Sequence, residues 1–197
     1  MSGRRSAPSL PRHCKLMFAT IYLPNFYLQA AIRHQPELRT QPVALIEEQE
    51  NKPVIIQLNH AAESTGVRKG MTPSQALARC LHVAIKTRER ARERSITEIL
   101  IQHAFTLSPF VESTAPGVCT IQFGRQPSRL SGQTGFTKVS RVIEQLAECE
   151  ITAQAGIAHL PDASFLAAHL ARPVLQIDDA KKFLALLPIE TLATALS

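Results

Sequence analysis

The chain has 197 residues, of which 45% are hydrophobic and 5% aromatic, and its formal net charge is +6. This composition is sufficient for a folded core, and it excludes collagen-like and low-complexity classes; the longest apolar runs are too short to span a bilayer. The basic balance suits a polyanionic partner such as nucleic acid without identifying one. The four widely spaced cysteines form no C-x-x-C pair, which argues against a zinc site and predicts reduced thiols in a cytoplasmic protein with no membrane partner.

The first half of the chain shows strands and short helices separated by prolines and glycines. Residues 1–15 are rich in Ser, Pro and Arg and are expected to form a disordered basic tail. Short apolar, partly β-branched runs predict strands, and Asn, Thr or Ser before a helical pattern predicts an N-cap. The expected elements are a strand at 16–23, a helix at 26–34, strands at 42–47 and 53–58 joined as a hairpin, a helix at 59–65 ending near Gly66, a helix capped by Thr72 or Ser74, and a strand at 83–85.

The second half alternates longer helices with strands. Apolar residues spaced i, i+3, i+4 predict amphipathic helices that cover a sheet. The expected elements are a helix at 95–105, strands at 111–114 and 118–123 around the Pro116-Gly117 turn, a helix at 138–147, a strand at 152–158, a helix at 162–170 capped by Asp162, and a last helix at 178–186.

Mixed strands and helices without a regular βαβ repeat predict an α+β fold, with helices packed on one face of a sheet. The sequence contains no P-loop, no G-x-G-x-x-G after a strand, no H-E-x-x-H and no G-x-S-x-G. The seven histidines are isolated from one another, so no metal site is expected from them. Because these motifs are absent, none of them assigns a reaction to the chain.

A series of segments, in order and spacing, resembles the Y-family DNA polymerases. The matching segments are Val43-Ala44-Leu45, Val54-Ile55-Ile56, Asn59-His60-Ala61-Ala62-Glu63, Gly66-Val67-Arg68-Lys69-Gly70-Met71, Leu107-Ser108-Pro109-Phe110-Val111-Glu112, Thr152-Ala153-Gln154-Ala155-Gly156-Ile157-Ala158 and Phe183-Leu184-Ala185-Leu186-Leu187-Pro188. The resemblance implies a ferredoxin-like palm at 16–35 and 86–172, a small α/β fingers insertion at 36–85, and the start of a helical thumb at 173–197. It also implies that the little finger is absent and that the chain stops about one helix into the thumb.

The resemblance also locates the positions where the family carries its metal-binding carboxylates. Polymerases transfer a nucleotidyl group with two Mg²⁺ ions, and Mg²⁺ requires oxygen ligands. In the family these come from an Asp-x-Asp after the first palm strand and a Ser-x-Asp-Glu in the second motif. The equivalent positions here are Tyr22, Pro24, Gly117 and Val118.

The contacts to the triphosphate depart from the family pattern as well. The fingers Tyr and Arg fall on His60 and Glu63, and an anion at Glu63 would repel a triphosphate. The paired aromatics after the first motif are retained as Phe26 and Tyr27. The resemblance therefore implies no catalytic, nucleotide-binding or metal-binding residue and no cofactor, with Mg²⁺ only if its ligands lie elsewhere.

Two of the altered motifs are similar to the ImuB-like branch of the family. These are Tyr22-Leu23-Pro24 and Thr114-Ala115-Pro116-Gly117. The resemblance implies a protein that is not an enzyme, a non-catalytic adaptor in the damage-induced mutagenic translesion synthesis of the SOS response. Its implied partners are DNA, an error-prone C-family DNA polymerase, a RecA-like accessory protein and the sliding clamp.

Four basic residues are candidates for DNA contact. Arg68 and Lys69 lie in the expected fingers turn, and Arg88 and Arg90 lie in a run that alternates Arg and Glu. Such a run is also typical of a solvated helix face with local ion pairs. We expect DNA binding to be weak, or confined to a full-length form. Two alternatives stay open: an active translesion polymerase with relocated metal ligands, and an unrelated ferredoxin-like binding module.

Overall fold

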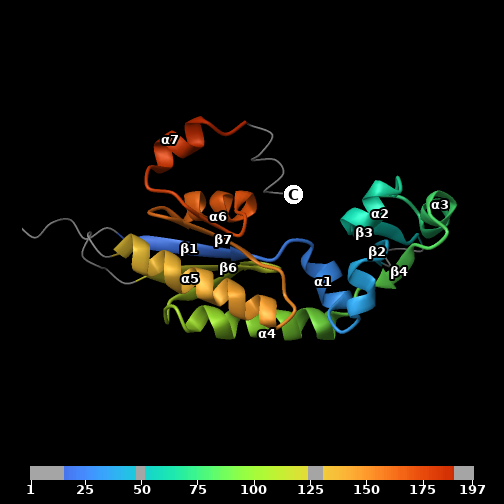
Figure 1. Cartoon of the computed structure of the whole chain (residues 1–197), viewed down its shortest axis with the longest axis horizontal. Coiled ribbons are helices and arrows are strands. Elements are labelled where there is room, and N and C mark those ends of the chain that lie inside the picture. The colour runs from blue at the N-terminus through green and yellow to red at the C-terminus, as the bar shows by residue number, and fades with distance from the viewer. Residues whose placement is uncertain (1–15, 48–51, 124–130, 189–197) are drawn as a thin grey trace, which may run out of the picture.

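The computed structural model describes residues 16–47, 52–123 and 131–188. The predicted basic tail at 1–15 and the end of the predicted thumb, from residue 189, lie outside the described residues. Two separate sheets with their own helices form a larger and a smaller lobe (Figure 1). No helix in the described ranges is both long and apolar enough to cross a membrane.

The larger lobe is built on a five-stranded sheet with the order β5-β6-β1-β7-β8. The central strand β1 (Met17–Tyr22) pairs antiparallel with β6 (Val118–Phe123) and β7 (Gln154–Ala158). At one edge, β5 (Val111–Ala115) forms a hairpin with β6. At the other edge, the three-residue β8 (Val174–Gln176) runs parallel to β7.

Helices cover both faces of this sheet, so the prediction that they lie on one face is wrong (Figure 1). The helices α4 (Arg90–Phe105) and α5 (Ser131–Glu148) lie on one face, and α6 (Pro161–Leu170) packs on β7 and β1 from the other. The main hydrophobic core lies between the sheet and the helices α4 and α5. Its fully buried large side chains are Ile21, Leu23, Ile96, Leu100, Ile121, Leu146, Ile151 and Ile157.

Small residues explain why α6 lies so close to the sheet. A Cβ atom placed on Gly156 of β7 would lie 2.1 Å from the Ser164 carbonyl oxygen and 2.3 Å from the Ala168 nitrogen. The helix backbone thus rests directly on the strand. The N-cap of α6 is Leu160, and Asp162 lies in the first turn, so the predicted Asp162 cap is wrong. A proline at the first helical position supplies the helical φ there.

The smaller lobe is a three-stranded sheet with the order β3-β2-β4. The antiparallel pair β2 (Val43–Glu47) and β3 (Val54–Leu58) confirms the predicted hairpin, and β4 (Ala84–Thr87) runs parallel to β2. The helices of this lobe are α2 (His60–Ser64) and α3 (Pro73–Arg79). A capping box at Thr72 begins α3, and Gly66 ends α2 at φ 88, as the sequence predicted. This lobe has its own buried cluster of Ala44, Ile46, Ile55, Ala62, Val67, Ala76 and Val83.

One helix belongs to the packing of both lobes. In α1 (Phe26–Ile32), Phe26 joins the main core while Leu28 packs with residues of β2. The Leu28 N–H also donates to Gln57 Oε1 of β3 at 2.9 Å. A short 3₁₀ helix, η1 (Pro36–Arg39), which was not predicted, completes the crossing to β2. The last helix before residue 189, α7 (Ala180–Ala185), is capped by Asp179.

Candidate functional site

A row of hydroxyl groups crosses the α6 side of the larger sheet. Strand alternation directs Thr20 and Tyr22 of β1 to this side, away from the main core. The fully buried Thr20 Oγ1 lies 2.8 Å from Ser164 Oγ of α6 and 3.3 Å from Thr120 Oγ1 of β6. Thr114 of β5 donates to Thr120 at 2.9 Å. Paired hydroxyls thus connect β5, β6, β1 and α6 across this face.

Three aromatic rings gather at the end of β1, beside this row. The Tyr22 ring stacks on His169 of α6 with centroids 4.0 Å apart and planes 22° apart, and His169 lies 4.4 Å from the Phe165 ring. His169 Nδ1 lies 2.9 Å from the Phe165 carbonyl oxygen, which must accept the proton and so places it on Nδ1. Burial raises the pKa of the Tyr22 phenol. The phenol therefore remains neutral, and the end of β1 carries a cluster of stacked rings.

The structure brings the four predicted carboxylate positions together. Tyr22 and Val118 are direct partners across the β1–β6 ladder. The Leu23 N–H donates to the Gly117 carbonyl oxygen at 2.8 Å, and Pro24 follows. Gly117 has φ 73 in the β5–β6 turn, a backbone conformation that favours glycine. These four positions are therefore neighbours in the fold.

The side chains at this place do not fit a magnesium centre. A phenol, a valine, a proline ring and a glycine present no carboxylate oxygen to a hard cation. On the neighbouring strand, Glu112 is exposed and pairs through its backbone with Thr120. Within the residues that the structure describes, no group of three or more His, Cys, Asp and Glu side chains could hold a metal ion.

The predicted nucleotide positions and two of the DNA candidates lie on the smaller lobe. His60 and Glu63 are exposed residues of α2. The Arg68 guanidinium donates to the backbone carbonyls of Glu63 at 2.6 Å and Val67 at 2.8 Å, which fixes the turn after α2. Lys69 is exposed. DNA contact by Arg68 and Lys69 stays a prediction.

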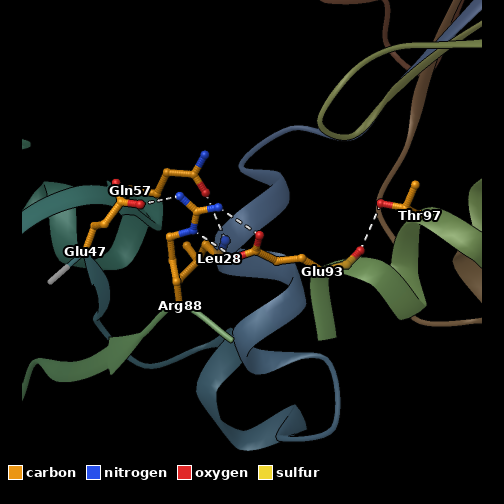
Figure 2. Close-up of polar contacts among 6 residues, drawn as sticks. All are labelled: Leu28, Glu47, Gln57, Arg88, Glu93 and Thr97. Carbon is orange, nitrogen blue, oxygen red and sulfur yellow. Dashed lines mark hydrogen bonds and ion pairs between the residues drawn. The ribbon is translucent and has the colours of Figure 1, made fainter. Parts of the chain in front are cut away.

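The third DNA candidate, Arg88, is held between the two lobes (Figure 2). Its guanidinium contacts Glu47 of β2 at 2.5 Å and both carboxylate oxygens of Glu93 of α4 at 2.8 Å. It also lies 3.8 Å from the centroid of the Tyr27 ring of α1. The hydrogen bonds to Glu93 raise the Arg88 pKa further above its usual value. Its donors are therefore largely used within the protein, whereas Arg90, the fourth candidate, is exposed.

The sequence did not identify the partners of these residues. In α6, Ala168 is fully buried against β7, and the neighbouring His169 stacks on Tyr22. A local signal existed, because Phe165 and His169 are four positions apart on a helix and so share a face. No local sequence signal predicts the contact of His169 with Tyr22 or that of Glu47 with Arg88.

A five-stranded sheet with a three-stranded sheet inserted after its first strand and helix is the architecture of a DNA polymerase palm with fingers. The structure resembles the crystal structure of DinB from Sulfolobus solfataricus (TM-score 0.74, 14% identity, 89% of this chain, 52% of that chain). It also resembles the insertion ternary complex of Dbh DNA polymerase (TM-score 0.76, 14% identity, 89% and 53%). The chain belongs to the impB/mucB/samB family, whose model matches residues 21–169. It is the N-terminal part of a Y-family polymerase fold.

Two curated relatives carry the name DNA polymerase IV. The protein of Citrobacter koseri is 27% identical over 180 residues, covering 83% of this chain and 48% of the relative. That of Pectobacterium atrosepticum is 26% identical over 174 residues, covering 84% and 48%. The chain thus spans about half the length of the curated relatives that it matches.

These comparisons correct two expectations. The prediction that the chain is not an enzyme is contradicted, because its relatives are named as DNA polymerases and the similar structures are of polymerases. The alternative of an unrelated ferredoxin-like module is wrong, because the family model matches the chain and the inserted sheet is present.

Proposed function

We propose that this protein acts as an adaptor in damage-induced, mutagenic translesion synthesis. In this role it brings an error-prone C-family DNA polymerase and a RecA-like accessory protein to the sliding clamp at damaged DNA. The proposal rests on the resemblance to the ImuB-like branch and on one structural observation. That observation is the Tyr22–His169 stack at the place where the family carries its metal-binding carboxylates.

The packing around Tyr22 supports a role in assembly. A stacked ring pair is a stable element of a surface, and the hydroxyls beside it bond to one another rather than standing open to a ligand. A triphosphate would instead need cations and metal ligands at this place. The packed side chains make this surface rigid, and an adaptor requires rigid surfaces that bind several partners at once.

DNA contact is part of the same proposal. One similar structure is the insertion ternary complex of Dbh DNA polymerase, and this chain shares that fold. Lys69 of the smaller lobe is an exposed cation in reach of a phosphate. A contact of this kind weakens steeply as salt rises, so its salt dependence can be measured directly.

The adaptor proposal is tested by co-purification of the full-length protein from cells after DNA damage. We expect the C-family polymerase, the RecA-like protein and the clamp to be recovered together, and damage-induced mutation to fall when the gene is deleted. Recovery of none of these partners, with mutation frequency unchanged on deletion, would refute the proposal. A tagged protein of similar charge from the same cells serves as the control for ionic capture.

Nucleotidyl transfer by the protein itself is the second candidate, and the names of the curated relatives favour it. Its metal ligands would have to come from residues other than those at the end of β1. The test is template-directed primer extension by the purified full-length protein with Mg²⁺ or Mn²⁺. Extension that depends on the template and survives removal of contaminating polymerases would establish this candidate.

A further inference from the structure

A cleft of about 740 Å³ lies between α4, α1 and the β5–β6 hairpin, and we term it the α4 cleft. Its lining includes Tyr27, Arg90, Arg94, Glu98 and Ser113. Ser113 pairs across the sheet with Cys119, which belongs to the main core. The cleft therefore opens on the α4 side of the sheet, and the Tyr22 cluster lies on the opposite face.

The strand that borders this cleft has a free edge. Among the described strands, β5 pairs with β6 alone, and its residues from Glu112 to Ala115 are exposed. Hydrogen bonds in an antiparallel pair alternate along the strand, and the Gln122 N–H donates to the Phe110 carbonyl at 2.9 Å. It follows that Val111 and Ser113 direct their backbone N–H and C=O groups away from β6. These groups form a ready template for another strand.

The side chains that line the α4 cleft, which do not include Glu112 of β5, carry a local excess of positive charge. Arg90 and Arg94 lie one helical turn apart on α4, and both are exposed. In the described part of the chain, neither guanidinium has a hydrogen bond or ion pair. Glu93 is already neutralised by Arg88, which leaves Glu98 as the opposing charge in the cleft.

We propose that the α4 cleft and the free edge of β5 bind an extended, acidic peptide segment of a partner protein by strand addition. The peptide backbone would bond to Val111 and Ser113, and every second side chain would point toward Arg90 and Arg94. The edge offers carbonyl acceptors as well as N–H donors, and a peptide satisfies both. A nucleic-acid phosphate only accepts hydrogen bonds, so it leaves the carbonyls unpaired. The inference rests on the adaptor function and assigns one of its docking surfaces.

The test measures binding of the full chain to a fluorescein-labelled peptide of four Thr-Glu repeats by anisotropy. We expect saturable binding, and a loss of about tenfold or more in affinity for the Arg90→Glu/Arg94→Glu variant. Ser113→Pro removes an outward N–H, which an edge strand tolerates, and should weaken binding similarly. Arg79→Glu/Lys181→Glu, two exposed charge reversals on α3 and α7, is the control matched in net charge and should change affinity less than about twofold.

Changes in the peptide test the same surface without altering the protein. A Thr-Glu peptide N-methylated at alternate residues cannot pair fully with the edge, and a Thr-Lys peptide has the wrong charge, so both should bind weakly. The inference fails if the Thr-Glu peptide does not bind up to millimolar concentration, if the Thr-Lys peptide binds as well, or if the Arg90→Glu/Arg94→Glu variant binds normally. Displacement of the peptide by oligo-dT without a matching effect of N-methylation would show a nucleic-acid site and also overturn it. Because these measurements use the purified chain alone, their outcome is separate from that of the co-purification.

Discussion

Replacing Gly156 by alanine should weaken the fold by displacing α6 from the sheet. The new methyl group would lie 2.1 Å from the Ser164 carbonyl oxygen, 2.3 Å from the Ala168 nitrogen and 2.7 Å from the Ala167 carbonyl carbon. Ordinary carbon–oxygen contacts are about 3.3 Å or longer, so the helix must retreat by about 1 Å. All three atoms belong to the backbone and cannot turn aside as a flexible side chain could.

The expected cost is about 3 kcal/mol, at the upper end of values for overpacked cores. For a chain of this size, that corresponds to a fall of about 6–12 °C in the unfolding midpoint, measured by circular dichroism. The retreat should also separate His169 from Tyr22 and change the near-ultraviolet tyrosine signal. Gly135→Ala in α5 is the matched control, because the added methyl group would lie 3.6 Å from Met17 Sδ, an ordinary contact distance. That change should be neutral or stabilise by about 1 kcal/mol through helix propensity. An unchanged midpoint for Gly156→Ala would refute the close packing of α6 on β7.

Two further substitutions test contacts within the lobes and between them, and the titration of one thiol tests its burial. Arg88→Ala should destabilise by about 3 kcal/mol in urea unfolding, because Glu47 and Glu93 are left partly buried without their partner. Arg88→Lys keeps the charge but not the paired donors, so it should lose less than alanine; a lysine variant as stable as the unaltered protein would contradict a role for the bidentate geometry. Thr20→Val removes a buried hydroxyl that bonds a serine of α6 and should cost about 1–2 kcal/mol, whereas no loss would argue against the hydroxyl row. Burial raises the pKa of the Cys119 thiol to about 12 from 9.0. The unfolded chain then loses this proton first, so stability should fall as pH rises from 9 to about 12; in the folded protein at pH 8, alkylation followed by mass spectrometry should leave Cys119 unmodified.

Local sequence signals were sufficient for most of the elements. The apolar runs at 43–46 and 54–56 became β2 and β3, and Thr72 began α3 with the expected cap. These signals act through nearby backbone groups, so they can be read without knowledge of the fold. The three-residue strand β8 was missed because its pairing depends only on a parallel neighbour, β7.

The candidate site shows why the rest was not predictable. The resemblance placed Tyr22 and Val118 at related positions, and the sheet register then brought them opposite each other. Nothing in the sequence pairs Tyr22 with His169, because 146 residues separate them and the contact depends on how closely α6 approaches β7. Arg88 was one of four candidates for DNA contact, which stays a prediction. It is held by carboxylates from two lobes, and its contact with Glu47 depends on the tertiary structure.

The Arg88 contacts also bear on how the α4 cleft can work without separating the lobes. Arg88 lines the cleft beside Arg90, so an acidic ligand there could in principle compete with Glu93. The existing bonds oppose that exchange, because Glu93 occupies two donors at 2.8 Å and Glu47 a third. Exposed Arg90 and Arg94 offer a ligand carboxylate the same charge without breaking a partly buried pair, whose disruption costs several kcal/mol. The ligand should therefore bind to Arg90 and Arg94, while Arg88 keeps its bonds to Glu47 and Glu93 and so maintains the orientation of the lobes.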